Sequence, residues 1–446
     1  MSIVFEKRKT TSHEPSASQC RVAYIMSRFP KLTETFILFE MAAVEEQGVD
    51  VEVYPLLRAR NTATHPEGAS LFRKIVELFK APMSDAVMHR AARPFVERAR
   101  FAPMFNWPIL CAQLWFLFRR PVAYLQALFT LVWANLGSLN YLLGGLAVFP
   151  KVVYFARQME RDGVTHVHAH FANHPAAAAY VIHRLTGIPY SFTAHGADLQ
   201  VDQHMLREKV ATAKHVVTIS DYNREFIVKY CGAWARDRIR VVRCGVDTSV
   251  FDVSNRVESS ERLTIVCTGT LYEVKGHTHL IDACRLLDER GVDFECHLIG
   301  DGPLLATLQQ QVAGSGLEDR MLFRGRLTRE EIARQLRCSD VLVAPSVPTA
   351  SGRREGIPVV LMEAMASGLA VVASSISGIP ELVDHEFCGL LVEPRDSDAL
   401  ARAIVRLHDD PHMRQQLGQA AREKVCREYD LDTNAGRLIK LFEVDE

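Results

Sequence analysis

The strongest constraint on the fold of this chain is a segment in its second half, residues 339–383. Two short apolar runs, 340–344 and 370–373, are rich in valine and alanine and are bounded by turn-forming residues, which predicts two buried strands. Between them, Pro358 suits the first position of a helix that runs over 359–367 and ends at Gly368. A strand, a loop, a helix and a second strand in this order predict a βαβ unit with parallel strands.

The loop before this helix is the predicted ligand site, because parallel sheets bind ligands beyond the carboxyl ends of their strands. There the helix start presents free N–H groups and the positive end of its dipole, which suits a phosphate. Two carboxylates, Glu355 and Glu363, would repel a phosphate but would bind the hydroxyls at both ends of a nucleotide sugar. Their spacing alone is equally compatible with a solvated loop and a solvated helix face.

The run Glu355-Gly-Ile-Pro-Val-Val-Leu-Met-Glu363 resembles the E-x7-E signature of retaining, nucleotide-sugar-dependent glycosyltransferases of family 4, which have the GT-B fold. The neighbouring segments 364–373 and 378–381 are similar to that family as well. The resemblance implies that Glu363 holds the nucleotide ribose and that Glu355 contacts the donor sugar. It also implies a donor-binding set at the start of the helix: Gly356, Ile357, Pro358 and Val359.

The length of 446 residues, with 48% hydrophobic residues, is enough for two domains with their own cores. The resemblance extends over nearly everything from Arg21 onward and implies an α/β architecture of two facing Rossmann-like domains. The expected parts are a disordered tail at 1–20, an acceptor-binding domain at 21–255, a nucleotide-sugar-binding domain at 256–430, and a C-terminal segment at 431–446. This last segment is expected to pack back on the first domain.

Charge and cysteine usage narrow the class of protein further. A net charge of −1 gives no electrostatic reason to expect nucleic acid as a partner. The ten cysteines are scattered without a C-x-x-C pair, which is typical of reduced thiols in a cytoplasmic protein. Residues 1–19 are polar and basic without an apolar core, so no secretory signal is predicted.

The first strand of the second domain predicts a diphosphate site. It ends at Gly269, and Lys275 on the following loop is a point charge suited to a diphosphate. Members of the resembled family usually carry arginine directly after that glycine, whereas this chain has Thr270, so half of the expected cationic clamp is missing. Arg353 or Arg354 could supply the lost charge, and a solvated role for both is equally compatible.

A glycine turn one strand later completes the expected nucleotide site. It reads Gly-Asp-Gly-Pro over residues 300–303 and follows a predicted strand. The resemblance places this turn, and the loop before a predicted helix cap at Thr328, beside the nucleotide base. Gly302 is therefore included among the expected donor-binding residues, although the identity of the base is left open.

Histidines gather on two predicted strands of the first domain. His166, His168 and His170 alternate along one strand and so share a face that could ligate a metal. No carboxylate or cysteine stands close in sequence to complete such a site, and we expect no metal and no cofactor besides the donor substrate. The next strand, 190–194, delivers His195 and a glycine to the crevice. A lone histidine is usually structural, but the resemblance places His195 at the donor sugar, near the reacting bond.

The region 105–155 is strongly apolar and helical in pattern, with no charged residue between Arg120 and Lys151. Its length would allow a membrane span, but polar residues and glycines interrupt it, which favours core or packing helices. An interfacial anchor on a membrane surface is the main alternative. The features that suit an anchor are basic and aromatic residues: Arg119, Arg120, Lys151, Trp107, Trp115 and Trp133.

Together these observations predict a glycosyltransferase that moves a sugar from a nucleotide sugar to a glycan or a polyprenyl-linked saccharide, with retention at the anomeric carbon. The expected catalytic residues are His195, Lys275 and Glu355. Lys275 and the helix start would stabilise the departing diphosphate, as a metal does elsewhere. Two alternatives remain open: a nucleotide-sugar-binding protein without activity, and a hydrolase or epimerase on the same fold.

The first loop of the chain suggests where such an enzyme acts. Residues 29–36 read FPKLTETF in place of the glycine pair usual in the family. This variant resembles the branch that builds exopolysaccharides and colanic-acid-like polymers. We therefore expect a cytoplasmic enzyme of bacterial surface polysaccharide synthesis, held peripherally at the inner face of the inner membrane.

Overall fold

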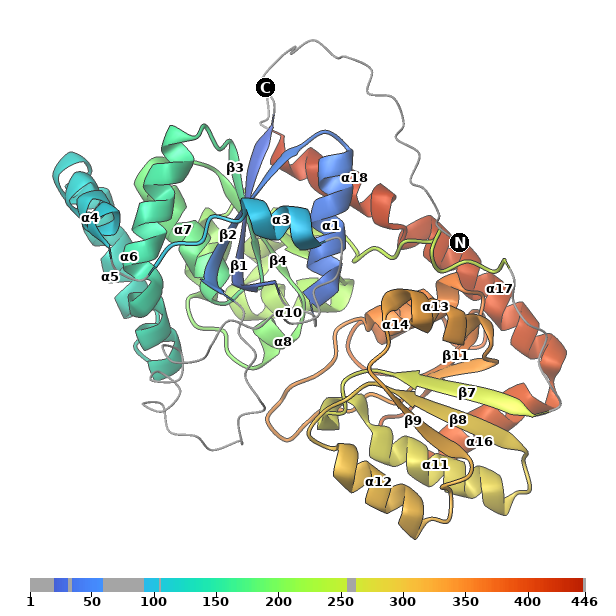
Figure 1. The fold of residues 1–446 in the computed structure, drawn as a ribbon. Helices are drawn as coiled ribbons and strands as arrows, with labels where there is room; N and C mark the ends of the chain where they lie inside the picture. Colours follow the sequence, from blue (N-terminus) through green and yellow to red (C-terminus); the bar gives the residue numbers. More distant parts are fainter. Residues whose placement is uncertain (1–19, 31–33, 59–91, 104–105, 255–261, 444–446) are drawn as a thin grey trace.

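The computed structural model describes residues 20–30, 34–58, 92–103, 106–254 and 262–443. Two six-stranded sheets form two domains that face each other (Figure 1). The strand order is β2-β1-β3-β4-β5-β6 in the first sheet and β12-β11-β10-β7-β8-β9 in the second. Neighbouring strands are parallel throughout both sheets. The predicted pair of Rossmann-like domains is therefore confirmed.

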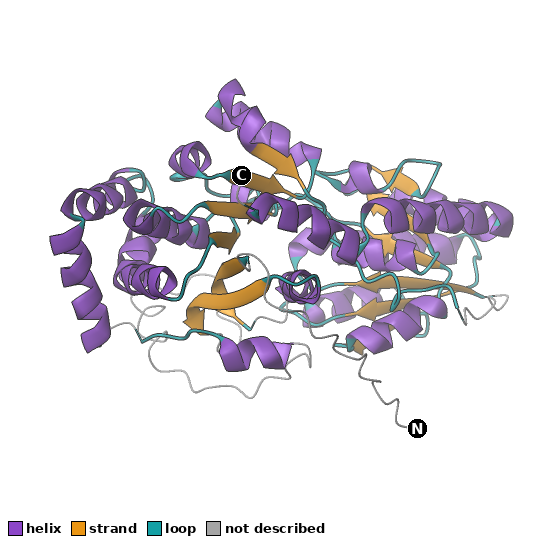
Figure 2. Ribbon diagram, turned by 90° about the horizontal axis from the view of Figure 1, so that it is seen from above, coloured by secondary structure: helices purple, strands orange, loops and turns teal. Residues whose placement is uncertain are grey.

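The first domain contains six strands with helices on both faces of the sheet (Figure 2). Its strands are β1 (Arg21–Phe29), β2 (Asp50–Arg58), β3 (His166–His170), β4 (Tyr190–Ala194), β5 (His215–Thr218) and β6 (Ile239–Val241). Its helices are α1 (Thr35–Glu46), α3 (Arg93–Arg98), α4 (Trp107–Arg119), α5 (Pro121–Trp133), α6 (Leu139–Arg161), α7 (His174–Thr186), α8 (Ala197–Gln200), α9 (Leu206–Thr212) and α10 (Asp221–Cys231).

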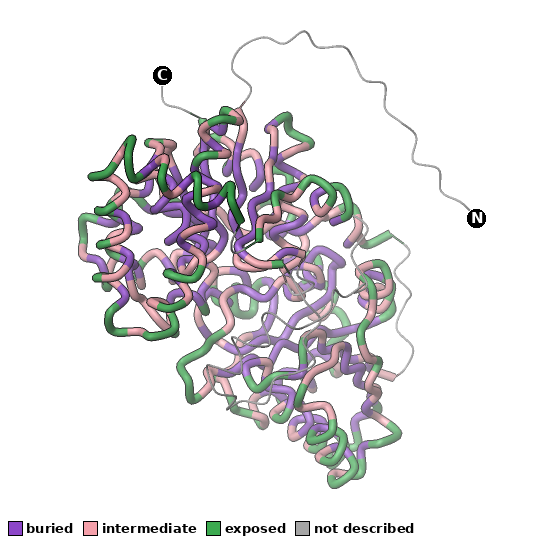
Figure 3. Tube along the Cα trace, turned by 60° about the vertical axis from the view of Figure 1, so that its left-hand side comes forward, coloured by how far each residue is buried: buried purple, intermediate pink, exposed green. Residues whose placement is uncertain are grey.

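The second domain repeats this arrangement. Its strands are β7 (Leu263–Thr268), β8 (Phe294–Ile299), β9 (Met321–Gly325), β10 (Val341–Ala344), β11 (Ala370–Ser374) and β12 (Leu390–Val392). Its helices are α11 (His277–Glu289), α12 (Leu305–Gly314), α13 (Arg329–Arg337), α14 (Val359–Ala366), α15 (Ile379–Leu382), α16 (Ser397–Asp409) and α17 (Pro411–Glu428). The predicted βαβ unit is thus β10, α14 and β11, and both of its strands are buried. Figure 3 shows that buried chain runs through the interior of both domains.

The last helix, α18 (Leu431–Phe442), leaves the second domain and packs on the first, beside α1 (Figure 1). The crossing point is held by backbone hydrogen bonds between Val246 and the turn before α18: Val246 N donates to Tyr429 O (2.8 Å), and Leu431 N donates to Val246 O (3.1 Å). The side chain of Phe442 is fully buried, with its ring 5.1 Å from the ring of His168. The C-terminal segment therefore returns to the first domain as expected.

Two expectations concerning domain limits fall mostly outside the described residues. The tail predicted at 1–20 lies there except for Cys20, and the limit between the domains at 255 lies within the stretch 255–261. All ten cysteines are described, and all are free thiols.

The apolar region forms the three helices α4, α5 and α6 at the outer side of the first domain (Figure 1). Among the described helices, α6 is long and apolar enough to cross a membrane. Its second half, however, contributes Val152, Phe155 and Met159 to the core of the domain. This arrangement is typical of a core helix. Lys151 does not flank an exposed surface as expected, because it is buried and its Nζ donates to Leu56 O (2.9 Å).

The packing of α18 predicts that Phe442→Ala destabilises the first domain. Removing a buried phenylalanine side chain costs about 3–5 kcal/mol, because transfer energy is lost and a cavity remains. We expect a fall of that size in the unfolding free energy from urea denaturation. The control is Lys440→Ala on the exposed side of α18, which should change stability by less than about 0.5 kcal/mol. Equal stability of the two variants would contradict the docking of this helix.

Candidate active site

Loops at the carboxyl ends of the two parallel sheets meet where the domains touch, because a Cβ added at Gly356 would lie 2.4 Å from the carbonyl oxygen of His195. The second domain contributes the loop after β7, which carries Lys275, and the loop between β10 and α14, which carries Glu355. The first domain contributes His195, directly after β4. The structure therefore brings the three predicted catalytic residues to one cleft from three separate strand ends.

Lys275 and Glu355 form an ion pair across two loops of the second domain. Lys275 Nζ lies 2.6 Å from Glu355 Oε2, and each side chain is 19% exposed. Ser346 Oγ also donates a hydrogen bond to Glu355 Oε2 (3.4 Å). The expected diphosphate cation and the expected sugar-binding carboxylate thus neutralise each other in the free protein.

Glycines let the loops of the second domain approach closely. The side chain of Lys275 runs along Gly269, where an added Cβ would lie 3.2 Å from its Cδ and Cε atoms. Gly302 packs on the backbone of Leu271, since an added Cβ would lie 2.7 Å from Leu271 O. The amide of Gly302 donates to Asp301 Oδ1 (2.7 Å). Gly302 therefore shapes the loop, and a contact with the donor stays a prediction.

The missing arginine leaves an exposed threonine beside Gly269. Thr270 is exposed, and so are Arg353 and Arg354. Arg354 reaches the first domain, where its Nη1 donates to the hydroxyl of Tyr222 (3.4 Å). It stays a prediction that Arg353 or Arg354 supplies the positive charge that Thr270 lacks.

The two domains approach most tightly at Gly356. A Cβ added there would lie 2.4 Å from the carbonyl oxygen of His195. On the other side, Gly196 has a φ of +127°, which favours glycine, and its own added Cβ would lie 3.4 Å from Gly356 Cα. Ile357 is buried in a cluster shared with Ile219 of the first domain. The predicted donor-binding glycine and the predicted catalytic histidine are therefore in contact.

The helix expected to receive the donor begins at Val359, one residue after Pro358. Pro358 is the capping residue, with φ −64° and ψ 127°, and not the first helical residue as predicted. Its fixed φ and missing N–H suit this position as well. Val359 is half-buried and opens the helix, which places its amide among those of the first turn.

Glu363, one turn into α14, is half-buried and has no side-chain hydrogen bond within the described parts of the chain. Burial raises the pKa of Glu363 to about 7, and the charge of Arg329 acts in the opposite direction. This carboxyl therefore takes up a proton much more readily than an exposed glutamate does. Hydrogen bonds from ribose hydroxyls to the charged form would lower the pKa again.

Arg329 is a site residue that the sequence did not predict. Its guanidinium lies 4.2 Å from the ring centroid of Phe39 in the first domain and 5.3 Å from that of Phe251. It also pairs with Asp247 (3.3 Å). The capping box at Thr328 is confirmed and fixes the start of α13, but only the fold brings Arg329 near Glu363.

Two further carboxylates organise the cleft and were also missed. Asp198 accepts hydrogen bonds from the amides of Ala172 (2.6 Å), His195 (3.0 Å) and Gly196 (2.8 Å). It thereby fixes the loops that follow β3 and β4. Its place two residues after a glycine is the one local signal that could have identified it.

Glu381 of the second domain forms a contact with the first domain. It belongs to α15, and its two oxygens accept hydrogen bonds from the first amides of α10, those of Asp221 (2.8 Å) and Tyr222 (2.7 Å). A carboxylate at a helix start is stabilised by the free N–H groups and the helix dipole. The glutamate of the segment 378–381 is thus an interdomain contact.

The three histidines of β3 are buried and hydrogen-bonded. His166 and His168 both bond to the hydroxyl of Ser191 (2.7 and 2.8 Å), and His168 also bonds to that of Thr193 (3.0 Å). His170 bonds to Glu40 Oε1 (3.0 Å) and to His195 Nε2 (3.1 Å). In the described residues, potential ligand atoms of Glu40, His168 and His170 lie within 4.8 Å of one another. Hydrogen bonds already engage both ring nitrogens of His168 and His170.

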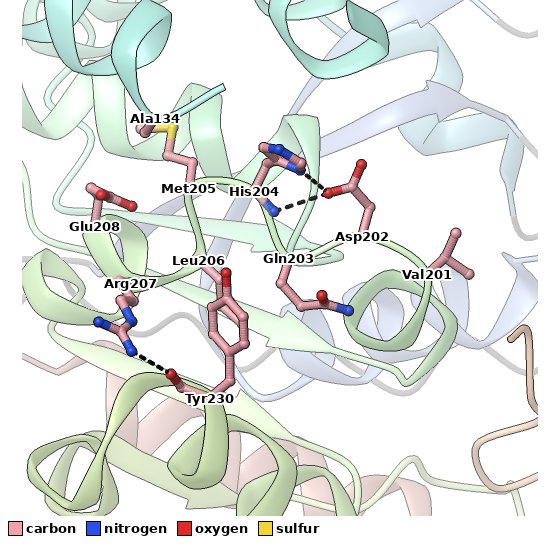
Figure 4. A pocket seen from close by; sticks show the side chains of 10 residues that line it. All are labelled: Ala134, Val201, Asp202, Gln203, His204, Met205, Leu206, Arg207, Glu208 and Tyr230. Atoms are coloured by element: carbon pink, nitrogen blue, oxygen red, sulfur yellow. Dashed lines mark hydrogen bonds and ion pairs between the residues drawn. The ribbon is translucent and has the colours of Figure 1, made fainter. Parts of the chain in front are cut away.

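A separate pocket of about 380 Å³ lies in the first domain, between the end of α5 and the loop from α8 to α9 (Figure 4). Its polar lining includes Asp202, which accepts from the amide of His204 (3.0 Å), and Arg207, which donates to Tyr230 O (2.9 Å). All of its lining residues belong to the first domain. The pocket is therefore not part of the donor cleft.

The raised pKa of Glu363 predicts a pH-dependent stability. Its folded-state pKa of about 7 lies above the ordinary value of 4.5, so its unfavourable contribution is absent below pH 4.5 and grows as the pH rises to about 7. We compare the unfolding free energy of Glu363→Gln with that of the wild type by urea denaturation. The gain of the variant over the wild type should be about 3 kcal/mol larger at pH 8 than at pH 4.5. The exposed Glu46→Gln is the control and should show no such gain. An equal pH dependence in both variants would contradict the burial of Glu363.

Comparison with known proteins gives two adjoining family matches. Residues 138–250 match the family described as Glycosyltransferase Family 4, and residues 252–424 match the family described as Glycosyl transferases group 1. The structure of HepE from Anabaena in complex with UDP has a TM-score of 0.65 at 17% identity, covering 95% of this chain and 99% of that one. This likeness establishes the GT-B fold.

Curated relatives share more of the sequence. The amylovoran biosynthesis glycosyltransferase AmsK of Erwinia amylovora is 36% identical over 257 residues, which cover 56% of this chain and 62% of AmsK. The putative colanic acid biosynthesis glycosyltransferase WcaL of Escherichia coli (strain K12) is 34% identical over 283 residues, covering 56% of this chain and 70% of WcaL. The matches span about two thirds of the relatives' own length. The chain therefore belongs to family 4 of the glycosyltransferases, in group 1.

Proposed function

We propose that this chain transfers a sugar from a nucleotide-sugar donor to a glycan or lipid-linked acceptor, with retention at the anomeric carbon, in bacterial surface polysaccharide synthesis. The observation that carries the proposal is the ion pair of Lys275 with Glu355, directly before Gly356, which touches the backbone of His195. Membership of family 4 supports a retaining transferase. The relatives AmsK and WcaL, named for amylovoran and colanic acid biosynthesis, support the polymer class.

The donor would lie along the start of α14. Glu363 would accept hydrogen bonds from the ribose hydroxyls, Glu355 would bind the sugar, and Lys275 would bind the diphosphate. The amides of Gly356 and Ile357 would face donor oxygens from the loop that touches the first domain. This arrangement uses the cation for the anionic part of the donor and the carboxylates for its hydroxyls.

During transfer, the bond between the anomeric carbon and the diphosphate oxygen breaks, and the acceptor oxygen bonds to that carbon from the same face. The proton of the acceptor hydroxyl passes to the departing diphosphate. Lys275 and the helix start stabilise the negative charge that develops on the leaving group. His195, at the contact with Gly356, borders the sugar on the side of the first domain.

The acceptor is proposed to be lipid-linked because the first domain presents a large apolar face, here called the α4–α6 face. Single exposed hydrophobic residues are normal on protein surfaces, but a contiguous apolar patch marks an interaction site. On α4, Trp107 is 73% exposed and Phe118 is 81% exposed. The other large hydrophobic residues of this face with high exposure are Leu110, Leu114, Leu117, Val122, Leu125, Phe129, Trp133, Leu136, Leu139, Leu143 and Leu146.

Arginines lie at one end of this face. Arg119 is exposed at the end of α4. Arg157, also exposed, stacks over the ring of Trp115 (4.4 Å). Arg120 pairs with Glu160 (2.7 Å) and is partly neutralised. Among the described residues, neither Arg119 nor Arg157 forms an ion pair. Exposed cations beside apolar and aromatic side chains suit the surface of an anionic bilayer. We propose that the enzyme is held there, at the cytoplasmic face of the inner membrane.

The alternatives, a binding protein without activity and a hydrolase or epimerase, differ from a transferase in turnover. A binding protein would hold the donor without releasing nucleotide, and a hydrolase would release nucleotide without an acceptor. The exposed Thr270 is the observation that favours the first alternative. Nucleotide release that requires an acceptor supports the transferase and excludes both.

The donor assignment predicts a difference between two variants. Glu363→Ala should weaken binding of the nucleotide diphosphate itself, whereas Glu355→Ala should weaken only the intact nucleotide sugar. Each lost hydrogen bond to a charged group should cost about 1.5–3 kcal/mol, measured by calorimetry with UDP, GDP and their hexose derivatives. The exposed Glu46→Ala serves as the control. Unchanged affinities in both site variants would refute the assignment.

The membrane assignment predicts that the protein floats with liposomes containing anionic lipid at low salt. Replacing Phe118 and Trp133 together by serine should abolish flotation, and Arg119→Glu should weaken it. The matched control is Phe387→Ser, because Phe387 is 66% exposed on the second domain. If the wild-type protein stays at the bottom with anionic vesicles, a membrane-bound acceptor is the wrong choice.

A further inference from the structure

A chain of hydrogen bonds runs from the first helix of the protein to His195. Glu40 Oε1 on α1 accepts from the hydroxyl of Tyr24 (3.3 Å) and bonds to His170 Nε2 (3.0 Å). His170 Nδ1 bonds to His195 Nε2 (3.1 Å). The remaining ring nitrogen of His195, Nδ1, lies 4.0 Å from the sulfur of Cys244. The chain thus connects a carboxylate, two imidazoles and a thiol in a line.

The carboxylate at one end determines where each proton lies. A carboxylate only accepts hydrogen bonds, so His170 must donate to it through Nε2–H. In a neutral ring the other nitrogen, Nδ1, then carries no proton and must accept. His195 therefore donates through Nε2–H, and its own Nδ1 is left as an acceptor. The Cys244 thiol, a weak donor, is compatible with that arrangement.

The surroundings hold both rings in this orientation. The ring of Phe36 lies 4.8 Å from that of His195, and the ring of Phe171 lies 4.9 Å from it. His170 is fully buried, and its ring stacks on that of Tyr24 (5.7 Å). Burial lowers the pKa of His195, so its ring is neutral at physiological pH.

We propose that Glu40 and His170 are positioning residues that hold His195 as the Nε2–H tautomer. The unprotonated Nδ1, which in the free protein lies 4.0 Å from the Cys244 sulfur, would then accept a hydrogen bond from a hydroxyl of the donor sugar. The contact with the sugar rests on the proposed function, whereas the tautomer is a property of the free protein. A carboxylate that fixes the tautomer of an active-site imidazole is a known device in enzymes. Here a second histidine lies between the two groups.

The arrangement makes a chemical demand on the donor. An unprotonated Nδ1 accepts a hydrogen bond, so the sugar must present an O–H group there. An analogue with fluorine at that position cannot donate to Nδ1. In the opposite tautomer His195 would donate to the hydroxyl oxygen instead, so only the Nε2–H tautomer requires a donating O–H group there. The hydrogen-bond chain from Glu40 to His195 therefore affects recognition of the sugar. It does not affect recognition of the nucleotide, which on the proposed function binds the second domain.

The tautomer can be observed without any ligand. We would label the protein with ¹⁵N-histidine and record two-bond ¹H–¹⁵N correlation spectra, assigning His195 through the His195→Gln variant. The wild type should show a protonated Nε2 and an unprotonated Nδ1 at His195. Glu40→Met, which removes the acceptor at nearly equal size, should give a mixture of tautomers. Glu40→Gln should largely preserve the wild-type pattern, because its carbonyl oxygen still accepts from His170.

The second measurement is transfer activity, with a nucleotide sugar that the wild-type enzyme uses as donor. Glu40→Met should lower kcat/KM for transfer at least tenfold, while the affinity for the free nucleotide diphosphate stays unchanged. In the His195→Gln background the same substitution should have no further effect, because the residues act as a unit. Glu46→Met, at an exposed position of the same helix, is the control and should match the wild type.

Several results would overturn the proposal. A protonated Nδ1 at His195 in the wild type would do so directly, as would an unchanged tautomer in Glu40→Met. If Glu40→Met does not fold, His170→Asn interrupts the chain at its middle and must give the same change at His195. If the protein shows the predicted tautomer but turns over no donor, the positioning roles of Glu40 and His170 are supported and the transferase assignment is refuted.

Discussion

The candidate site depends on one close approach, that of the Gly356 backbone to the carbonyl oxygen of His195. No side chain fits between them, so this contact sets how near the two domains can come. Glu381 reinforces it by accepting the first amides of α10, which places a charge at a helix start of the opposite domain. Because Gly356 follows Glu355 directly, the same contact limits how far the carboxylate of Glu355 can lie from His195.

The strands and the central βαβ unit could be predicted because strands of parallel sheets are buried on both faces and read as continuous apolar runs. Pro358 and Gly368 likewise mark the ends of α14, with an error of one position at its start. Arg329, Asp198 and Glu381 could not be predicted in this way. Their partners lie in other loops or in the opposite domain, and local pattern carries no information about such contacts.

The region of α4 to α6 shows a second limit of sequence analysis. Composition predicts apolar helices, but it does not assign each residue to the buried or the exposed face. Lys151, expected as a basic flank, instead donates to a carbonyl inside the domain, while Trp107 and Trp133 point outward. The sequence poses core packing and a surface face as alternatives, whereas α6 buries one half in the core and exposes leucines on the other.

The free protein holds the two carboxylates proposed to bind the donor, Glu355 and Glu363, in states that the donor would change. Glu355 is paired with Lys275, and burial raises the pKa of Glu363 to about 7. On the proposed function, a diphosphate draws Lys275 away and thereby leaves Glu355 as an unpaired carboxylate. Hydroxyls of the attached sugar can satisfy it, whereas a bare nucleotide diphosphate cannot. On the same proposal, the site would favour the intact donor over the nucleotide product, which would help the product to leave.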